Sequence, residues 1–401
     1  MILTKIKLMQ LMVRARTGLC LIVFLFPVSC NLGRVEEGSP TVKILPRNDT
    51  EGSNKNKILN VKFSLSPPSK LPVTVTFSTV DSTAKAGKDF IPITDGKIVF
   101  NPGETIKSAD VELISDTITE YTEQFKLQIT KVENALGTGQ SLTITISDDD
   151  FPKITLASDG YISSRSIPGL NLIFDDEFND TSLNIYSWNY NLGATQWRQQ
   201  LQSYTFSDQN IFLSQGKLNL TARINGHDYS SAGINTLNLF RIKYGLIQVR
   251  AKMPEGTGLW PSIWLLGTTF DGSNWPLCGE IDIATLRGQA PGQILGSVIY
   301  FLASSQSRER NYTLPNFQDT FSKQFHVFSI LWQEDQIDWY VDNHKYMGLN
   351  QAEIGNGWPF NQSFWFNISL AVGGSLVGPP DMTTRFPQTM QIDYVRYYTP
   401  E

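Results

Sequence analysis

Hydrophobic and polar positions alternate with a period of two in short runs along residues 41–150. This period is typical of strands that bury one face and expose the other. Turn residues separate the runs at spacings of about 10–15 positions, and no run has the periodicity of a helix. The clearest runs are Val73–Phe77, Ile98–Phe100, Val111–Ile114, Phe125–Ile129 and Leu142–Ile146. The pattern predicts an all-β sandwich of roughly seven strands in this region.

A second region, residues 165–399, is also predicted to be built of strands. Only two of its segments, Thr181–Tyr186 and Asn316–Ser322, suggest short helical turns. We place a boundary between the two regions at Asp150–Pro152. The expected domains, both all-β, are residues 41–150 and residues 151–401.

The first 29 residues have the features of an export signal. Lys5, Lys7, Arg14 and Arg16 form a basic segment, and Leu19–Val28 is an apolar run of about ten residues. Such a run is too short to span a bilayer and fits the hydrophobic region of a signal peptide.

The apolar run ends in Pro27–Cys30, which resembles the lipobox of bacterial lipoproteins. The resemblance implies that Cys30 is lipidated and becomes the first mature residue. The alternatives are ordinary signal cleavage near Ser29 and a core helix. We expect residues 1–29 to be a lipoprotein signal peptide and residues 30–40 a polar tether. The protein would then be exported and anchored by lipid to a membrane in the envelope, or at the surface, of a bacterium.

Composition and charge limit the kinds of molecule that the protein is expected to bind. The net charge is −5, and no stripe of Lys and Arg alternates with aromatic residues, so nucleic-acid binding has no support. Of the three cysteines, Cys20 would leave with the signal peptide and Cys30 would carry lipid. Cys278 then has no partner, and we expect no disulfide. We also expect a monomer.

An ordered series of short motifs runs through the first domain. The motifs are Glu51-Gly52, Phe63–Ser66, Ser78-Thr79, Thr83–Phe90, Phe100–Glu104, Asp116, Glu120, Glu123 and Ser147–Asp150. This order closely resembles the Calx-beta domain, an immunoglobulin-like module, over its full length.

Some members of this family bind calcium through acidic loops, so the resemblance implies a candidate Ca²⁺ site. Ca²⁺ takes six to eight oxygen ligands, which carboxylates from separate loops can supply. The candidate ligands are Glu51, Asp89, Asp116, Glu123, Asp148 and Asp150. The alternative is that these acids cap and solvate turns in a spacer domain, since Ser115 stands where the family often has an acid.

Two carboxylates mark the centre of the second domain. Glu280 and Asp282 alternate with Ile281 and Ile283, so on a strand both acids lie on one face. Carboxylates this close repel each other and shift each other's pKa, which is the arrangement that glycosidase chemistry uses.

The motifs around these acids resemble family 16 glycoside hydrolases of the laminarinase, or endo-β-1,3-glucanase, branch. They are Phe174–Phe178, Gln202-x-Tyr204, Asn210, Tyr244-Gly245, Arg250–Pro254, Gly258–Trp264, Phe325–Phe328, Trp358–Phe360, Ala371–Gly374 and Asp393–Arg396. The resemblance implies a concanavalin-like jelly-roll sandwich with a glucan cleft on its concave face. It also implies β-glucan as the partner and requires no cofactor.

The family's catalytic strand reads Glu-x-Asp-x-x-Glu with a β-bulge, or Glu-x-Asp-x-Glu without one. The resemblance implies that Glu280 is the nucleophile and that Asp282 assists it. The last Glu, the general acid/base, is Thr285 in the first register and Ala284 in the second. A threonine hydroxyl does not ionise near neutral pH, so it cannot replace this acid.

Two further cleft positions depart from the family pattern. The strand after the catalytic one has Ile299 in the region where relatives often have a histidine. Ser369 stands where they often have an asparagine. Together with Thr285, these losses of polar groups indicate weakened catalysis.

The residues expected to contact sugar match the family pattern better than the catalytic positions do. Trp260, Trp264 and Trp275 are candidates for stacking on pyranose rings, with sandwich core as the alternative for each. Asn210 and Arg250 match polar positions that contact sugar hydroxyls in relatives.

The sequence therefore predicts a surface lipoprotein that recognises laminarin-type β-1,3-glucan, with hydrolysis weakened or lost. One alternative is an active retaining endo-β-glucanase in which another acid substitutes for Thr285. A further alternative is a structural or adhesive surface protein.

Overall fold

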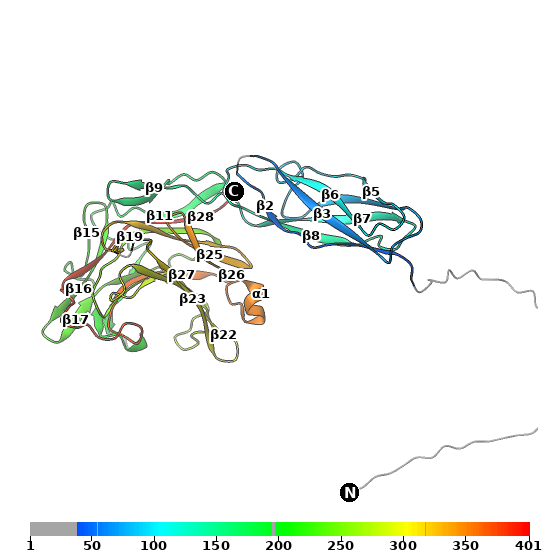
Figure 1. The fold of residues 1–401 in the computed structure, drawn as a ribbon. Coiled ribbons are helices and arrows are strands. Elements are labelled where there is room, and N and C mark those ends of the chain that lie inside the picture. The colour runs from blue at the N-terminus through cyan, green and yellow to red at the C-terminus, as the bar shows by residue number, and fades with distance from the viewer. Residues whose placement is uncertain (1–37, 54, 195–196, 317) are drawn as a thin grey trace, which may run out of the picture.

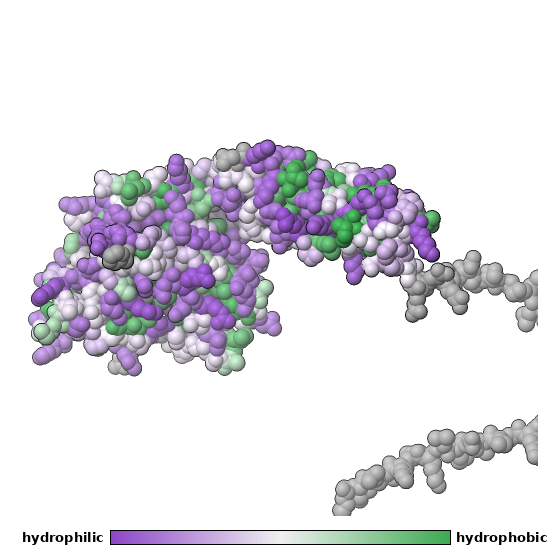
Figure 2. All heavy atoms as spheres, viewed as in Figure 1, coloured by the Kyte–Doolittle hydropathy of each residue, from purple (hydrophilic) through white to green (hydrophobic). Residues whose placement is uncertain are grey.

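The computed structural model describes residues 38–53, 55–194, 197–316 and 318–401. The predicted signal peptide, most of the tether and Cys30 lie outside these residues. No helix in the described part of the chain has the length and apolar character needed to cross a membrane. In the view of Figure 2, hydrophilic residues cover most of both domains and hydrophobic ones are scattered among them.

The first domain is a sandwich of two sheets, as predicted (Figure 1). One sheet has the strand order β1-β3-β6, and the other has the order β2-β8-β7-β4-β5. The strands are β1 (Thr41–Ile44), β2 (Asp49–Thr50), β3 (Lys57–Ser66), β4 (Val73–Asp81), β5 (Gly96–Phe100), β6 (Ile106–Leu113), β7 (Glu123–Glu133) and β8 (Ser141–Ser147). The five predicted runs fall on β4 to β8, although Ile114 lies just beyond β6. Every second residue of β3 from Leu59 to Leu65 is buried, which is the alternation that the prediction used.

The second domain is a sandwich of an 11-stranded and a 7-stranded sheet. The larger sheet has the order β13-β14-β17-β16-β28-β19-β24-β25-β26, with β11 on β28 and β15 on β16. Its strands are β11 (Leu170–Asp176), β13 (Gly193–Ala194), β14 (Gln202–Tyr204), β15 (Ile211–Leu213), β16 (Leu218–Asn225), β17 (Asp228–Ser231), β19 (Gly245–Lys252), β24 (His326–Trp332), β25 (Gln336–Val341), β26 (His344–Asn350) and β28 (Gln388–Pro400).

The smaller sheet has the order β12-β18-β27-β20-β21-β22-β23 and carries the candidate catalytic strand at β21. Its strands are β12 (Asn189–Tyr190), β18 (Gly233–Asn235), β20 (Leu259–Gly267), β21 (Glu280–Leu286), β22 (Gln293–Phe301), β23 (Ser305–Thr313) and β27 (Phe364–Val372). The core lies between the two sheets and contains Trp188, Trp332 and Trp339, each at most 1% exposed.

Helices are rare among the described residues: α1 (Gln351–Ile354) and the 3-10 helices η1 (Trp197–Gln199) and η2 (Gly355–Gly357). Near Thr181–Tyr186 the structure has one helical turn of the kind predicted, in which the N–H groups of Ser187 and Trp188 both donate to the carbonyl oxygen of Asn184 at 3.0 Å. The described residues of Asn316–Ser322 likewise form turns. Segments this short have too few hydrogen bonds to offset the cost of starting a helix.

The two domains adjoin end to end (Figure 1). The hairpin of β9 (Ile154–Ala157) and β10 (Gly160–Ser163) follows the first domain. The ring of Phe151 stacks on that of Tyr340, with centroids 3.7 Å apart. The main-chain N–H of Thr122 donates to the side-chain oxygen of Gln333 at 3.1 Å. Packing and hydrogen bonds therefore both cross the junction.

A β-bulge interrupts β21 at the point where the family register requires it. Asp282 pairs with Ser297 of β22, but Thr285 pairs with Leu295, so β21 has one extra residue. Gly296 lies opposite the bulge, where an added Cβ would approach the Tyr346 hydroxyl to 2.4 Å. The close packing of the larger sheet against β22 therefore requires a glycine at this position.

Candidate active site

A cleft of about 500 Å³ lies on the exposed face of the seven-stranded sheet. Strands β18, β27, β20, β21, β22 and β23 all contribute side chains to it. Glu280, Asp282 and Thr285, the three predicted catalytic positions, line this cleft together. Ala284 is instead buried in the core between the sheets, so the bulged register is the one that the chain adopts.

Glu280 is held by two donors at the floor of the cleft. It is 4% exposed, and its Oε2 accepts a hydrogen bond from the indole N–H of Trp275 at 2.6 Å. Its Oε1 lies 3.4 Å from Nη2 of Arg198. Burial raises the pKa of Glu280, and the negative charge of Asp282 raises it further, while Arg198 and Trp275 act in the opposite direction.

Asp282 and Thr285 make their own contacts on the same face. The hydroxyl of Ser297 donates to Oδ2 of Asp282. Burial raises the pKa of Asp282, and this hydrogen bond opposes the rise. The hydroxyl of Thr285 donates to that of Ser262 at 3.1 Å. Position 285 thus presents a neutral hydroxyl, already hydrogen-bonded, where the family resemblance implies a carboxyl group.

Two charged residues of the cleft were missed from the sequence. Arg198 belongs to η1, and its carbonyl oxygen accepts a hydrogen bond from the N–H of Ser375 at 2.8 Å. Glu309 of β23 pairs with Ser297, which pairs with Asp282, so the three lie in one row across the sheet. Alternation along β23 could have indicated the face of Glu309. Nothing local indicates the position of Arg198.

The predicted tryptophans divide into two kinds. Trp260 and Trp264 of β20 line the cleft, as expected for sugar-stacking rings. Trp260 is only 6% exposed, because Ala371 and Val377 pack against it. Trp275 is half-buried and does not line the cleft, but its indole binds Glu280.

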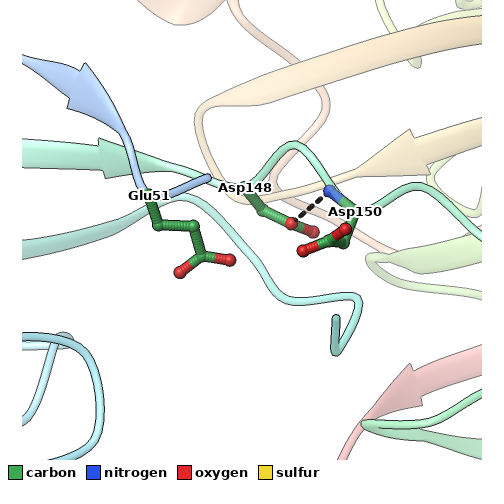
Figure 3. Close-up of side chains that lie close together, drawn as sticks. All are labelled: Glu51, Asp148 and Asp150. Atoms are coloured by element: carbon green, nitrogen blue, oxygen red, sulfur yellow. Dashed lines mark hydrogen bonds between the residues drawn. The ribbon is translucent and has the colours of Figure 1, made fainter. Parts of the chain in front are cut away.

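The candidate calcium ligands form two groups rather than one. Ligand atoms of Glu51, Asp148 and Asp150 lie within 4.8 Å of one another (Figure 3). The second group consists of Asp89, Glu120 and Glu123. Glu120 was not among the predicted ligands, and Asp116, which was, belongs to neither group.

Known proteins match both domains. The family model for glycosyl hydrolases family 16 matches residues 197–396. A β-glucanase of Rhodothermus marinus is 32% identical over 253 residues, which are 59% of this chain and 87% of that protein. The laminarinase catalytic domain of Thermotoga maritima is 37% identical with a TM-score of 0.53, and the match covers 58% of this chain and 99% of that domain. The chain belongs to glycoside hydrolase family 16.

Other matches extend this assignment. The glucan endo-1,3-β-glucosidase A1 of Niallia circulans is 38% identical over 270 residues, which are 60% of this chain. The match spans only 39% of that longer protein. Residues 45–150 match the Calx-beta domain. The resemblances of both domains are therefore confirmed at the level of the family.

Two predicted sugar contacts of the family 16 domain need correction, because neither residue lines the cleft. Arg250 lies on β19 of the other sheet, 2% exposed, and forms ion pairs with Asp159 and Asp393. Asn210 is 3% exposed, and its amide donates to the main-chain oxygen of Thr221 at 2.8 Å. Both side chains are engaged in hydrogen bonds within the protein, so they hold the fold and not the sugar.

The first acidic group of the Calx-beta domain has the properties of a cation site. Buried oxygens of Glu51 and Asp150 have no hydrogen-bond partner. Among the described residues, no lysine or arginine forms an ion pair with this group. Burial, followed by the charge of Asp148, raises the pKa of Glu51 to about 8, and burial raises that of Asp148 to about 6.

The second acidic group is partly neutralised. Lys88 lies 2.5 Å from Glu120 and 3.9 Å from Asp89. Burial and the neighbouring Asp89 raise the pKa of Glu123.

Uncompensated, desolvated carboxylates suit a Ca²⁺ ion, which would supply the missing positive charge. The residues of the first group therefore fit the ion better than those of the second.

Proposed function

We propose that the family 16 domain binds laminarin-type β-1,3-glucan and that its hydrolysis of glucan is weakened or lost. One observation carries the proposal: Thr285 lies on the cleft face beside Glu280 and Asp282, where a retaining glycosidase needs a carboxyl group. We further propose that the protein is exported and anchored in a membrane by lipid on Cys30.

The chemistry explains why one residue matters so much. A retaining glycosidase protonates the leaving sugar oxygen and later activates water with the same carboxyl, about 5 Å from the nucleophile. This assistance is worth roughly 10²–10⁴-fold in rate. The hydroxyl of Thr285 cannot exchange a proton in this way near neutral pH. Glu280 can still attack, but the leaving group of a natural glucan departs poorly.

Support for glucan binding comes from the aromatic residues and the size of the cleft, and from the names of the relatives. Trp260 and Trp264 line the cleft, and aromatic rings can stack on the apolar faces of pyranose rings. The two relatives described above carry the names glucan endo-1,3-β-glucosidase and β-glucanase. A cleft of about 500 Å³ is within the size range of sites that bind small ligands.

A binding isotherm on laminarin, run beside a reducing-end assay on the same polymer, tests the proposal. We expect binding with little release of reducing ends. Trp264→Ala should weaken binding by about tenfold, which corresponds to about 1.4 kcal/mol. Trp264→Phe, which keeps an aromatic face, is the matched control and should bind nearly as well as wild type. Absence of binding in wild type would contradict the proposal.

Glu309 supports a second candidate function, an active endo-β-glucanase with a substitute acid. Three carboxyl side chains line the cleft among the described residues, and Glu309 is the one that the family mechanism does not assign. Its charge raises the pKa of Asp282, so it lies within electrostatic reach of the catalytic strand. If wild type hydrolyses laminarin, Glu309→Gln should abolish the activity while binding persists.

For the Calx-beta domain we propose a Ca²⁺ ion held by Glu51, Asp148 and Asp150. The buried oxygens without partners, and the lack of a paired cation among the described residues, support this assignment. Calcium would stabilise the domain by neutralising carboxylates that otherwise repel one another.

A further inference from the structure

The guanidinium group of Arg198 lies in the cleft beside the catalytic carboxylates. Its Nη2 is 3.4 Å from Oε1 of Glu280. Its central carbon is 5.0 Å from the ring centre of Trp275 and 5.8 Å from that of Trp260. Its charge lowers the pKa of Asp282 as well as that of Glu280. One cation therefore lies near two tryptophan rings and acts on both carboxylates.

The main chain holds Arg198 in this place. Its carbonyl oxygen accepts the N–H of Ser375 at 2.8 Å. Gly374 allows this approach, because a Cβ there would lie 3.1 Å from the Arg198 oxygen and 3.0 Å from the ring of Trp260. Arg198 itself has φ 49° and ψ 33°, a left-handed conformation that is uncommon for a residue with a side chain. The contacts of the turn thus hold a conformation that the residue alone would rarely adopt.

The space beside Glu280 is where the reacting sugar of a retaining glycosidase has to lie. Reacting atoms approach to about 3–3.5 Å, so the anomeric carbon must come as close to Glu280 as Arg198 now does. Both oxygens already accept hydrogen bonds, one from Trp275 and one from Arg198. The sugar also gains positive charge in the transition state, which an adjacent guanidinium disfavours.

We propose that Arg198 occupies the sugar position beside Glu280, so that glucan binds along the rest of the cleft without reaching the nucleophile. This inference rests on the proposed glucan binding, because it assigns which part of the cleft is open to sugar. It also adds an obstacle to hydrolysis that is independent of Thr285.

Covalent labelling of Glu280 by 2,4-dinitrophenyl β-laminaribioside tests the proposal. An oxygen of the Glu280 carboxylate forms a bond to the anomeric carbon. The bond from that carbon to the phenolic oxygen breaks, and its electron pair leaves as dinitrophenolate, so no acid is needed. Mass spectrometry of the intact protein follows labelling over a pH series that extends above the raised pKa of Glu280. Glu280→Gln gives the background.

Arg198→Asn and Arg198→Gly remove the guanidinium with residues that tolerate the left-handed conformation. We expect both to be labelled faster than wild type by about tenfold to about a hundredfold, the range for removing hydrogen bonds to a charged group. Arg198→Lys, which keeps the charge, should stay near wild type. Arg241→Asn, at an exposed arginine outside the cleft lining, is the matched control. Melting temperatures verify that each variant is folded.

Equal labelling of wild type and Arg198→Asn over the whole pH series would overturn the proposal. Slower labelling that recovers only at higher pH would overturn it too, because Arg198 would then serve to ionise Glu280. A laminarin isotherm separates this inference from the proposed function. If neither protein binds laminarin, glucan binding fails, and the labelling comparison still decides the role of Arg198.

Discussion

The indole N–H of Trp339 donates a hydrogen bond to the main-chain carbonyl of Asp282 at 2.8 Å. Trp339 belongs to the larger sheet, so this bond crosses the core to the strand that carries the candidate catalytic acids. The bulge of β21 begins at Asp282 and interrupts the regular ladder there. Trp339 therefore satisfies a buried carbonyl next to the feature that turns Thr285 toward the cleft.

Trp339→Phe should both destabilise the protein and weaken glucan binding. The change leaves the Asp282 carbonyl without its buried donor, which costs about 1–3 kcal/mol. Urea unfolding measures the stability, and a laminarin isotherm measures binding. Trp332→Phe is the matched control, because its indole also donates to a buried carbonyl, that of Phe360, at 3.2 Å. Equal effects of both variants on binding would contradict a special role for Trp339.

Much of the fold could be predicted because strand periodicity is local. Each strand of the first domain buries one face, so alternation alone located runs such as Val73–Phe77. The same period placed Glu280 and Asp282 on one face. Predicting that Thr285 faces the cleft also required the β-bulge. The packing of this bulge involves Gly296 and Trp339, which belong to two other strands. The bulge could be expected from the family register, but not from the strand's own residues.

The remaining parts of the site depend on distant contacts. Arg198 lies in the cleft because its carbonyl oxygen accepts a hydrogen bond from the N–H of Ser375. No local sequence pattern indicates this contact. Arg250 and Asn210 were expected in the cleft because the motif matched, yet a motif gives the identity of a residue and not the direction of its side chain. The ion-pair partners of Arg250, such as Asp393, were visible only in three dimensions.

The stability of the protein should fall between about pH 4.5 and about pH 8 when calcium is absent. Folded Glu51 keeps its proton up to about pH 8, whereas the group's ordinary pKa is 4.5. The folded state then binds more protons over this interval, so the free energy of unfolding decreases as the pH rises. Calcium binds the ionised carboxylates and should reverse the loss, by about 2.7 kcal/mol at a hundred times its Kd. Melting temperatures with chelator and with calcium measure both effects.

Glu51→Gln should remove the part of this pH dependence that Glu51 contributes and should weaken the calcium effect, because the side chain stays neutral. Asp110→Asn is the control, since Asp110 lies outside both acidic groups and an asparagine keeps an oxygen that can accept the amide N–H of Asn60. If the melting temperature of wild type changes with neither pH nor calcium, the proposed calcium site is contradicted and the domain is a spacer.

Cys30→Ser should release the protein from the membrane fraction, because the proposed lipid is the anchor. Wild type extracted from membranes should carry a diacylglyceryl group on Cys30, which mass spectrometry detects. Cys20→Ser, at the other cysteine before residue 31, is the matched control and should stay membrane-bound. Soluble wild type with an unmodified Cys30 would contradict the lipoprotein proposal.

Thr285→Glu should restore hydrolysis of laminarin, measured as reducing ends released. The new carboxyl can protonate the leaving sugar oxygen and then activate water. Because Arg198 is proposed as a second obstacle, the single variant should gain only part of the roughly 10²–10⁴-fold that acid–base assistance provides. The double variant Thr285→Glu/Arg198→Asn should gain the rest.

Thr285→Gln is the matched control for this restoration, because it has the shape of a glutamate without an ionisable proton. It should bind laminarin and hydrolyse no faster than wild type. A wild-type rate typical of active laminarinases would contradict the weakened hydrolysis. A double variant that binds laminarin but stays inert would contradict the account given for Thr285 and Arg198. The loss would then have to lie with Ile299 and Ser369, which line the same cleft where the family often has a histidine and an asparagine.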